Sequence, residues 1–225
     1  MSGEEEVNGK ESETNEEAVA PSLAVEYSAF EKWPYRQILY PTDQEQSWRD
    51  MGNSYFGACR PLIAALANGE LREDIEGSAA IFLFRHYLEL MLKRILFSGR
   101  ILASGDELVA VEDIAEVSKT HDLATIWDWV IKDAKPKLPE WDNYDVASVK
   151  QCVMEFHKAD RGGVAFRYDR EGGELYRFDF AALNDQMDHI RQVLEGIWTG
   201  LSEMAHAIRE YEAELQSEYG SDLYW

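Results

Sequence analysis

Apolar residues recur every three or four positions along most of this chain, which is the spacing of amphipathic α-helices. Glycine, proline and short polar stretches separate the periodic segments from one another. This succession predicts a mainly α-helical fold, an up-and-down helical bundle. The predicted helices cover residues 42–69, 72–98, 111–117, 122–135, 144–159 and 181–218.

The second and the last of these helices differ from the others. Helix 72–98 is apolar on most of its circumference, which predicts a position in the middle of the bundle. Helix 181–218 keeps one apolar stripe for more than thirty residues, so it is long enough to extend beyond a single domain and pair with a partner. Its stripe consists of Leu183, Met187, Ile190, Leu194, Ile197, Trp198, Leu201, Met204, Ala205, Ile208, Tyr211 and Leu215.

The helical pattern is interrupted once, before the last helix. Val164–Tyr168 and Leu175–Phe178 flank the turn-rich residues 169–173, which predicts one short β-hairpin. At the other end of the chain, the first residues carry seven Glu and no aromatic side chain, a composition typical of disorder. The predicted division is a disordered acidic leader at 1–22, an aromatic and proline-rich extended arm at 23–41, a helical bundle domain at 42–218 and a C-terminal tail at 219–225.

Charge narrows the range of partners. The chain has 43 acidic and 22 basic residues, a net charge of -21. Phosphate backbones repel such a chain, which argues against broad non-specific binding of nucleic acid. The same charge suits a partner with a basic surface, or it serves solubility alone.

Several classes of protein are excluded by missing patterns. Cys59 and Cys152 form neither a zinc-binding spacing nor a disulfide framework, and Cys59 fits a small buried apolar position. Neither a phosphate-binding P-loop nor a Gly-x-Ser-x-Gly elbow occurs. We therefore predict no cofactor and no metal site. The first residues are acidic where a signal peptide is basic, and no apolar run approaches 20 residues, so we expect a cytoplasmic protein that does not enter a membrane.

Candidate chemistry begins on helix 72–98. Arg85, Glu89 and Lys93 follow one another at four-residue spacing, so they line one side of this largely apolar helix. Buried charges must be paired, and Arg167 is a candidate partner for Glu89 from outside the helix. Two interpretations stay open: a paired network that fixes helix packing, or a site for a ligand or for catalysis. The predicted polar network consists of Arg85, His86, Glu89, Lys93, His121, Asp122, Arg161, Arg167 and Tyr168.

Residues 45–215 resemble the HEPN (higher-eukaryote and prokaryote nucleotide-binding) superfamily. The likeness rests on the helix Arg85–Lys93, on Thr120–Trp127 with its His-Asp-Leu, on Glu155–Phe156 and on Phe166–Tyr168. It implies an up-and-down helical bundle, frequent homodimerisation and roles in toxin–antitoxin or antiphage systems. Many HEPN proteins are metal-independent ribonucleases, with an Arg followed after four to six residues by a His. That spacing does not occur after any Arg of this chain.

We therefore expect a HEPN-like protein of a bacterial defence, toxin–antitoxin or phage-conflict system. It would form a homodimer and act by binding a protein partner, a nucleotide or RNA, without ribonuclease activity. One alternative is a divergent ribonuclease that uses His86 or His157 as acid and base, with Arg161 or Arg167 stabilising the phosphorane. Another is an inhibitor whose acidic surface mimics nucleic acid.

Overall fold

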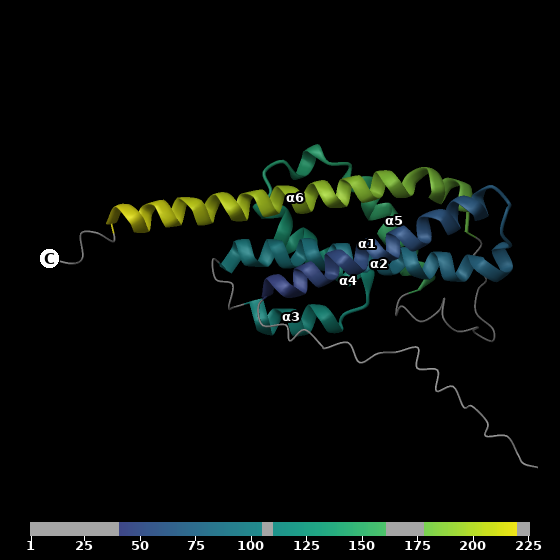
Figure 1. The fold of residues 1–225 in the computed structure, drawn as a ribbon, viewed down its shortest axis with the longest axis horizontal. Coiled ribbons are helices and arrows are strands. Elements are labelled where there is room, and N and C mark those ends of the chain that lie inside the picture. Colours follow the sequence, from purple (N-terminus) through teal and green to yellow (C-terminus); the bar gives the residue numbers. More distant parts are fainter. Residues whose placement is uncertain (1–40, 105–109, 161–177, 220–225) are drawn as a thin grey trace, which may run out of the picture. The chain divides into compact units, whose positions relative to one another are not determined.

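The computed structural model describes residues 41–104, 110–160 and 178–219. This part of the chain is helical and contains no strand, which confirms the predicted mainly α-helical bundle with a long C-terminal helix (Figure 1). All of it belongs to one folding unit, Ile38–Trp225. The α-helices are α1 (Pro41–Ala67), α2 (Glu73–Ser104), α3 (Ala110–Lys119), α4 (Leu123–Trp129), α5 (Val146–Ala159) and α6 (Phe180–Tyr219).

Several predicted segments lie outside the described residues. They are the acidic leader at 1–22, the arm at 23–41 apart from Pro41, and the tail apart from Tyr219. The hairpin expected over residues 164–178 also lies outside them, except for Phe178, which is not part of a strand.

The α1–α2 connection is a short helix stop of the kind that the sequence predicts. Gly69 adopts a positive φ of 71°, and the Glu70 N–H donates to the Ala65 carbonyl at 2.8 Å, closing the end of α1. Pro61 lies inside α1, which continues through it as one helix. Pro61 and Gly57, whose carbonyl it leaves without a helical donor, are both exposed, so water can satisfy that carbonyl.

The helix predicted over 122–135 is interrupted in the structure. After α4 the chain widens into the π-helical turn η1 (Val130–Ala134), and the 3₁₀ turns η2 (Lys135–Lys137) and η3 (Trp141–Asn143) follow. At this point α2 passes very close, because a Cβ on Gly99 would lie 2.6 Å from the Cα of Ala134. Glycine at this position therefore allows η1 to rest directly on the backbone of α2.

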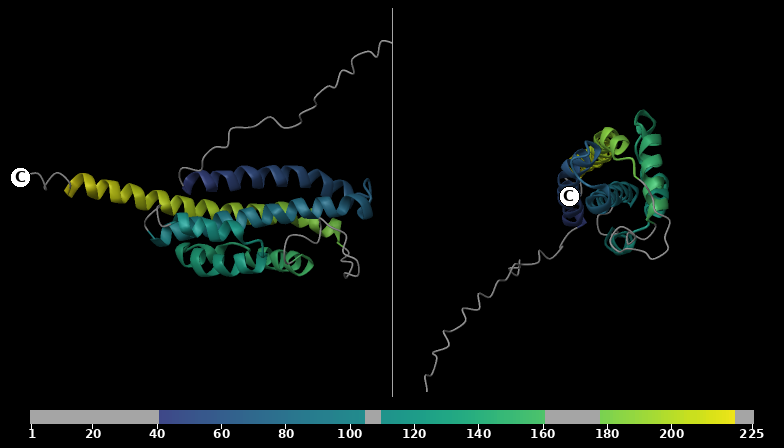
Figure 2. Two further views of the ribbon diagram at one scale, coloured as in Figure 1. Left: turned by 90° about the horizontal axis from the view of Figure 1, so that it is seen from below. Right: turned by 90° about the vertical axis from the view of Figure 1, so that its right-hand side faces the viewer.

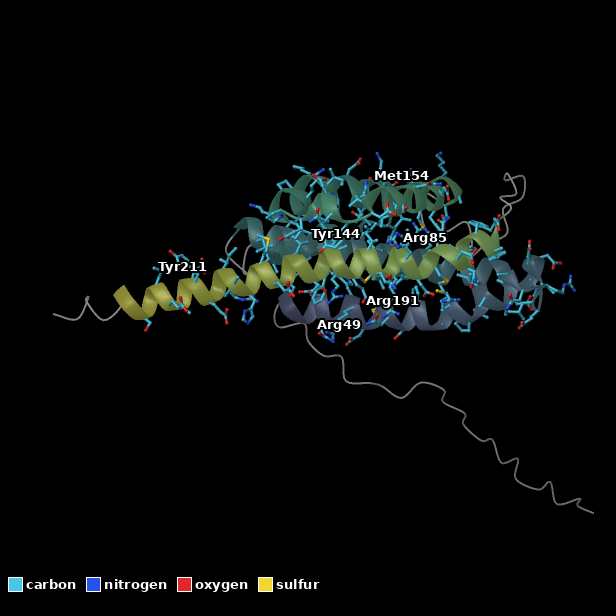
Figure 3. The ribbon with its side chains drawn as sticks, turned by 90° about the horizontal axis from the view of Figure 1, so that it is seen from above. Arg49, Arg85, Tyr144, Met154, Arg191 and Tyr211 are labelled. Atoms are coloured by element: carbon cyan, nitrogen blue, oxygen red, sulfur yellow. The ribbon has the colours of Figure 1, made fainter. Side chains whose placement is uncertain are left out.

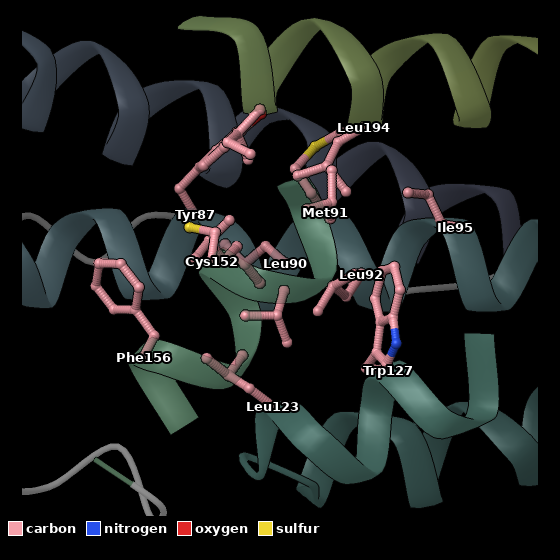
Figure 4. Packing of buried hydrophobic residues seen from close by; sticks show 14 of the residues in the cluster. Tyr87, Leu90, Met91, Leu92, Ile95, Leu123, Trp127, Cys152, Phe156 and Leu194 are labelled. Atoms are coloured by element: carbon pink, nitrogen blue, oxygen red, sulfur yellow. The ribbon is translucent and has the colours of Figure 1, made fainter. Parts of the chain in front are cut away.

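α2 forms the centre of the bundle, as its apolar circumference predicts. It packs against α1, α3, α4, α6, η1 and η2, and every residue from Tyr87 to Gly99 is buried. The side chains of Leu123, Trp127 and Phe156 approach α2 from α4 and α5 (Figure 4). The core is therefore built around one helix that neighbours cover on several sides.

α6 runs beside α1 and α2 and continues past them (Figures 1 and 2). Its side chains alternate between buried and exposed as far as Leu201, the last buried residue. Beyond Leu201 no described side chain is buried, over a stretch that ends at Tyr219. None of the helices in the described ranges has the length and apolar character needed to span a membrane.

Candidate functional site: a closed charge network

The middle of α2 carries three charged side chains inside the core. Arg85, Glu89 and Lys93 are 0%, 3% and 3% exposed. The Arg85 Nη1 donates to Glu89 Oε2 at 3.0 Å, and the Lys93 Nζ donates to Glu89 Oε1 at 2.8 Å. One carboxylate thus pairs with a cation one helical turn away on each side. Figure 3 shows Arg85 in the body of the bundle.

Groups from other elements complete the coordination of the two cations. The Arg85 Nη2 donates to the His121 carbonyl at 2.6 Å, and its Nε lies 3.4 Å from the Asp160 carbonyl and 3.6 Å from the Asp160 carboxylate. The Lys93 Nζ donates to the Ser118 carbonyl at 3.1 Å. The two cations of α2 therefore hold three segments against this helix: the end of α3, the start of α4 and the end of α5.

His121 is the part of this group that reaches solvent. Its Nδ1 lies 2.8 Å from Glu89 Oε1, and its side chain is 55% exposed. Burial alone would raise the pKa of Glu89, but Lys93 and His121 outweigh burial and hold that pKa below its ordinary value. Glu89 is consequently ionised at neutral pH. We refer to Arg85, Glu89, Lys93, His121 and Asp160 as the charge network.

Asp122 and His157 lie next to the charge network. The Asp122 carboxylate accepts the Thr125 N–H at 2.8 Å and so caps the N-terminus of α4. The same oxygen lies 3.5 Å from the Nδ1 of His157, which is 19% exposed near the end of α5. This contact joins α5 to the start of α4.

The other residues of the predicted polar network are placed differently or not described. The ring of His86 lies against Tyr55 and Phe82, with centroid distances of 5.1 and 4.7 Å, and so packs among aromatic side chains. Arg161, Arg167 and Tyr168 lie outside the described residues, and with them the predicted Arg167–Glu89 pair.

A second, partly buried ionic cluster, which no sequence pattern indicates, joins α1, α2 and α6. Glu45 accepts the Trp198 Nε1–H at 2.6 Å and lies 3.4 Å from the Nε of Arg94. The Arg94 guanidinium lies 3.3 Å from the centre of the Trp198 ring. Burial lowers the pKa of Arg94, and Glu45 opposes this effect. No local pattern marks these residues, because Glu45 and Trp198 are 153 positions apart.

Asp160 was also missed, although it is the buried carboxylate beside Arg85. It stands at the C-terminal end of α5, with its N–H bonded to the Phe156 carbonyl at 2.9 Å. A single Asp after a helix has no periodicity, so the sequence offers no signal for it.

A hollow of about 410 Å³ lies elsewhere, between the end of α1, the start of α2 and the start of α6, and Leu66, Glu73 and Phe180 are among its lining residues. In the described part of the chain, no group of three or more His, Cys, Asp or Glu side chains is placed to hold a metal ion.

Comparisons with protein-family models, with curated protein sequences and with solved structures found no match for this chain.

Proposed function

We propose that this chain is a non-catalytic, protein-binding member of the HEPN-like class of helical proteins. The bacterial defence, toxin–antitoxin or phage-conflict setting is the one that its sequence resemblance implies. The observation that carries the binding role is the end of α6, where apolar residues continue at regular spacing beyond Leu201, the last residue of this helix that is buried in the described core.

The exposed seam, as we call Met204, Ile208, Tyr211 and Leu215, follows the spacing three and four that places residues on one helix face. Met204, at the start of the seam, is half-buried against the core, and Leu215, at its end, is half-buried as well. Ile208 is 43% exposed and Tyr211 is 62% exposed. Regularly spaced large apolar side chains on a solvated helix favour a protein-binding surface, because a purely solvated helix gains nothing from them. The seam therefore fits a partner helix laid along α6.

The charge network supports the non-catalytic part of the proposal. Arg85 and Lys93 are buried and each donates to a carboxylate and to a backbone carbonyl. Cations held in this way are not available to a phosphate group in solution. Their role is to fix α3, α4 and α5 on α2.

Matched variants test the binding role. The full chain is immobilised and its binding partners are identified, purified and titrated by calorimetry, with Ile208→Asp and Ala213→Asp as competitors. Both variants add one negative charge to the same exposed part of α6, but Ala213 lies off the seam. Binding lost in Ile208→Asp and kept in Ala213→Asp supports the proposal. If no interaction of the chain, with itself or with another protein, depends on Ile208, the proposal fails.

One observation favours a second candidate, a divergent metal-independent ribonuclease. Glu89 holds the Nδ1 of His121 at 2.8 Å, which leaves Nε2 of a half-exposed imidazole for proton transfer. A carboxylate that orients a histidine in this way is typical of a general base.

The test is incubation with total RNA and tRNA in EDTA. Cleavage that is lost in His121→Ala and kept in His206→Ala, a change at an exposed histidine of α6, would favour the enzyme over the binding protein. Cleavage that depends on His86 or His157 instead would favour the acid and base predicted from the sequence. Absence of cleavage by the folded wild-type chain removes this candidate.

A further inference from the structure

The exposed seam of α6 has a spacing and a length that suit one particular partner. We infer that it pairs antiparallel with the exposed seam of a second copy of this chain, an inference that rests on the protein-binding role proposed above. Three observations carry it: the continuity of the seam with the core of the fold, the length of uncovered helix, and the order of small and acidic residues beside the seam.

The seam continues a pattern that the fold already uses for helix packing. From Met187 onward the apolar residues of α6 alternate in steps of three and four, the spacing of a two-helix coiled coil. The first half of the series is between 0% and 1% exposed, and α6 there packs on α1 and α2. In the second half Met204 still packs partly against the core, and from Ile208 onward none of the described members is buried. The full series is Met187, Ile190, Leu194, Ile197, Leu201, Met204, Ile208, Tyr211 and Leu215.

The length of the uncovered helix fits a copy of itself. From Ser202 to Tyr219 the helix measures about 27 Å at 1.5 Å per residue. In Figure 3, Tyr211 lies on this stretch, past the ends of the other helices. When two such stretches run antiparallel, Met204 meets Leu215 of the second copy and Ile208 meets Tyr211. Residues 202–217 of each copy are then paired, and Glu218 and Tyr219 extend past the paired stretch.

The flanking residues are self-complementary in this register. Ala205 and Ala207 flank the first half of the exposed seam, whereas Glu212 and Glu214 flank the second half. Antiparallel pairing sets Ala205 opposite Glu212 of the second copy and Ala207 opposite Glu214. No glutamate then faces a glutamate, and each glutamate stem can cover the core beside a small alanine.

The net charge of the uncovered stretch determines how the stability of the dimer depends on salt. Residues 202–219 contain five Glu and one Arg, a net charge of -4 with His206 neutral. Two copies repel each other at long range, so added salt should tighten the dimer by screening this repulsion. A partner with basic flanks would respond in the opposite way. The paired stretch is only about five turns long, so the interface is small and the dimer should depend on protein concentration.

Sedimentation of the full chain at several concentrations and salt levels tests the pairing. We expect a monomer–dimer equilibrium that shifts at least tenfold toward monomer in Ile208→Asp and stays near wild type in Ala213→Asp. Circular dichroism checks that both variants keep their helical content. A wild-type chain that stays monomeric at every concentration and salt level overturns the inference, as does dimerisation that Ile208→Asp leaves unchanged.

Disulfide trapping tests the orientation. The double variant Ala205→Cys with Glu212→Cys should form a covalent dimer under oxidation, because the two positions meet across an antiparallel pair. Tyr211→Cys alone should trap a dimer only if the helices run parallel, which would overturn the inference. The native thiols should not interfere, because Cys59 and Cys152 are buried and burial raises their pKa to about 12.

These results separate the two proposals. A monomeric chain that still binds another protein through Ile208 overturns self-pairing and leaves the protein-binding role standing. A monomeric chain whose interactions never depend on Ile208 overturns both.

Discussion

Charge and apolar surface are placed in opposite ways in two regions of this molecule. In the middle of α2 an arginine is fully buried, whereas at the end of α6 a tyrosine of the apolar seam is 62% exposed. Burial statistics favour an exposed arginine and place tyrosine between the buried and the exposed residue types. The two regions differ in where the compensating groups lie. Arg85 has its partners inside the chain, but Tyr211 has no apolar cover among the described residues.

Under the proposed function, this difference separates a structural feature from a binding surface. Besides His121, which reaches solvent, the charge network contains two buried cations, Arg85 and Lys93, and two buried carboxylates, Glu89 and Asp160, so these four buried charges balance within the core. A balanced buried network needs no external ligand and serves to position helices. The exposed seam is not balanced in this way, and a second protein surface is what would complete it.

The largest effect is expected from opening the charge network. Glu89→Ala leaves Arg85 and Lys93 buried without their shared carboxylate, which should lower the free energy of unfolding by about 3–5 kcal/mol. Glu210→Ala is the matched control, because it removes an exposed carboxylate four residues from His206 and should cost at most about 0.5 kcal/mol. Urea denaturation measures both values. Equal effects of the two variants would mean that the charge network is not closed.

The next effect compares two positions of one apolar series. Leu194 is 0% exposed and Ile208 is 43% exposed, although both belong to the same heptad pattern of α6. Leu194→Ala should cost about 2–5 kcal/mol, because it opens a cavity in the core. Ile208→Ala should change the stability of dilute protein by less than about 0.5 kcal/mol.

Thermal and urea unfolding at low and high protein concentration check this pair. A cost of Ile208→Ala that grows with protein concentration would reveal the dimer. A large cost at every concentration would mean that Ile208 packs against this chain itself.

A smaller effect is expected from acid. The pKa of Glu89 is lowered from its ordinary value of 4.5 because Lys93 and His121 outweigh the effect of burial. The stability that this ionised group contributes is therefore complete above pH 4.5 and is lost as the pH falls through the lowered pKa. Glu89→Gln should be less stable than wild type at pH 7, and the gap should narrow toward pH 3. A constant gap from pH 7 to pH 3 would contradict the ionic role of Glu89.

The sequence predicted what depends on periodicity. The helices, the central position of α2 and the length of α6 follow from apolar spacing, and the four-residue spacing of Arg85, Glu89 and Lys93 already places these side chains on one helix face. What periodicity does not contain is the partner from a distant segment. Asp160, Glu45 and Arg94 are isolated charged residues in the sequence, and only tertiary packing brings them to their ion-pair partners.

The interruption of the helical pattern after α4 also depends on tertiary packing. Residues 122–135 have a helical pattern, but the close contact between Gly99 and Ala134 goes together with a wider π-helical turn. The end of α6 shows a second limit, because one uniform apolar pattern is buried as far as Leu201 and is not buried beyond it among the described residues. Sequence spacing defines a helix face but not what covers it.

The smallest effect is expected at Tyr87, whose buried hydroxyl belongs neither to the charge network nor to the exposed seam. Tyr87 is fully buried beside Phe56 and Phe84, and its hydroxyl has no hydrogen-bond partner among the described residues. Burial also raises the pKa of this hydroxyl. A buried hydroxyl without a partner has lost its bonds to water and gained none, so Tyr87→Phe should keep or raise stability, by at most about 1 kcal/mol.

Phe56→Leu serves as the control for general sensitivity of this part of the core, and it should destabilise because it removes ring contacts with Tyr87. Urea denaturation of both variants is the measurement. A loss of 1 kcal/mol or more in Tyr87→Phe would show that the hydroxyl binds a buried water molecule or another polar group. Tyr87 would then resemble the charge network in having a partner for its buried polar atom. A neutral or stabilising result would show that the hydroxyl forms no stabilising hydrogen bond in this fold.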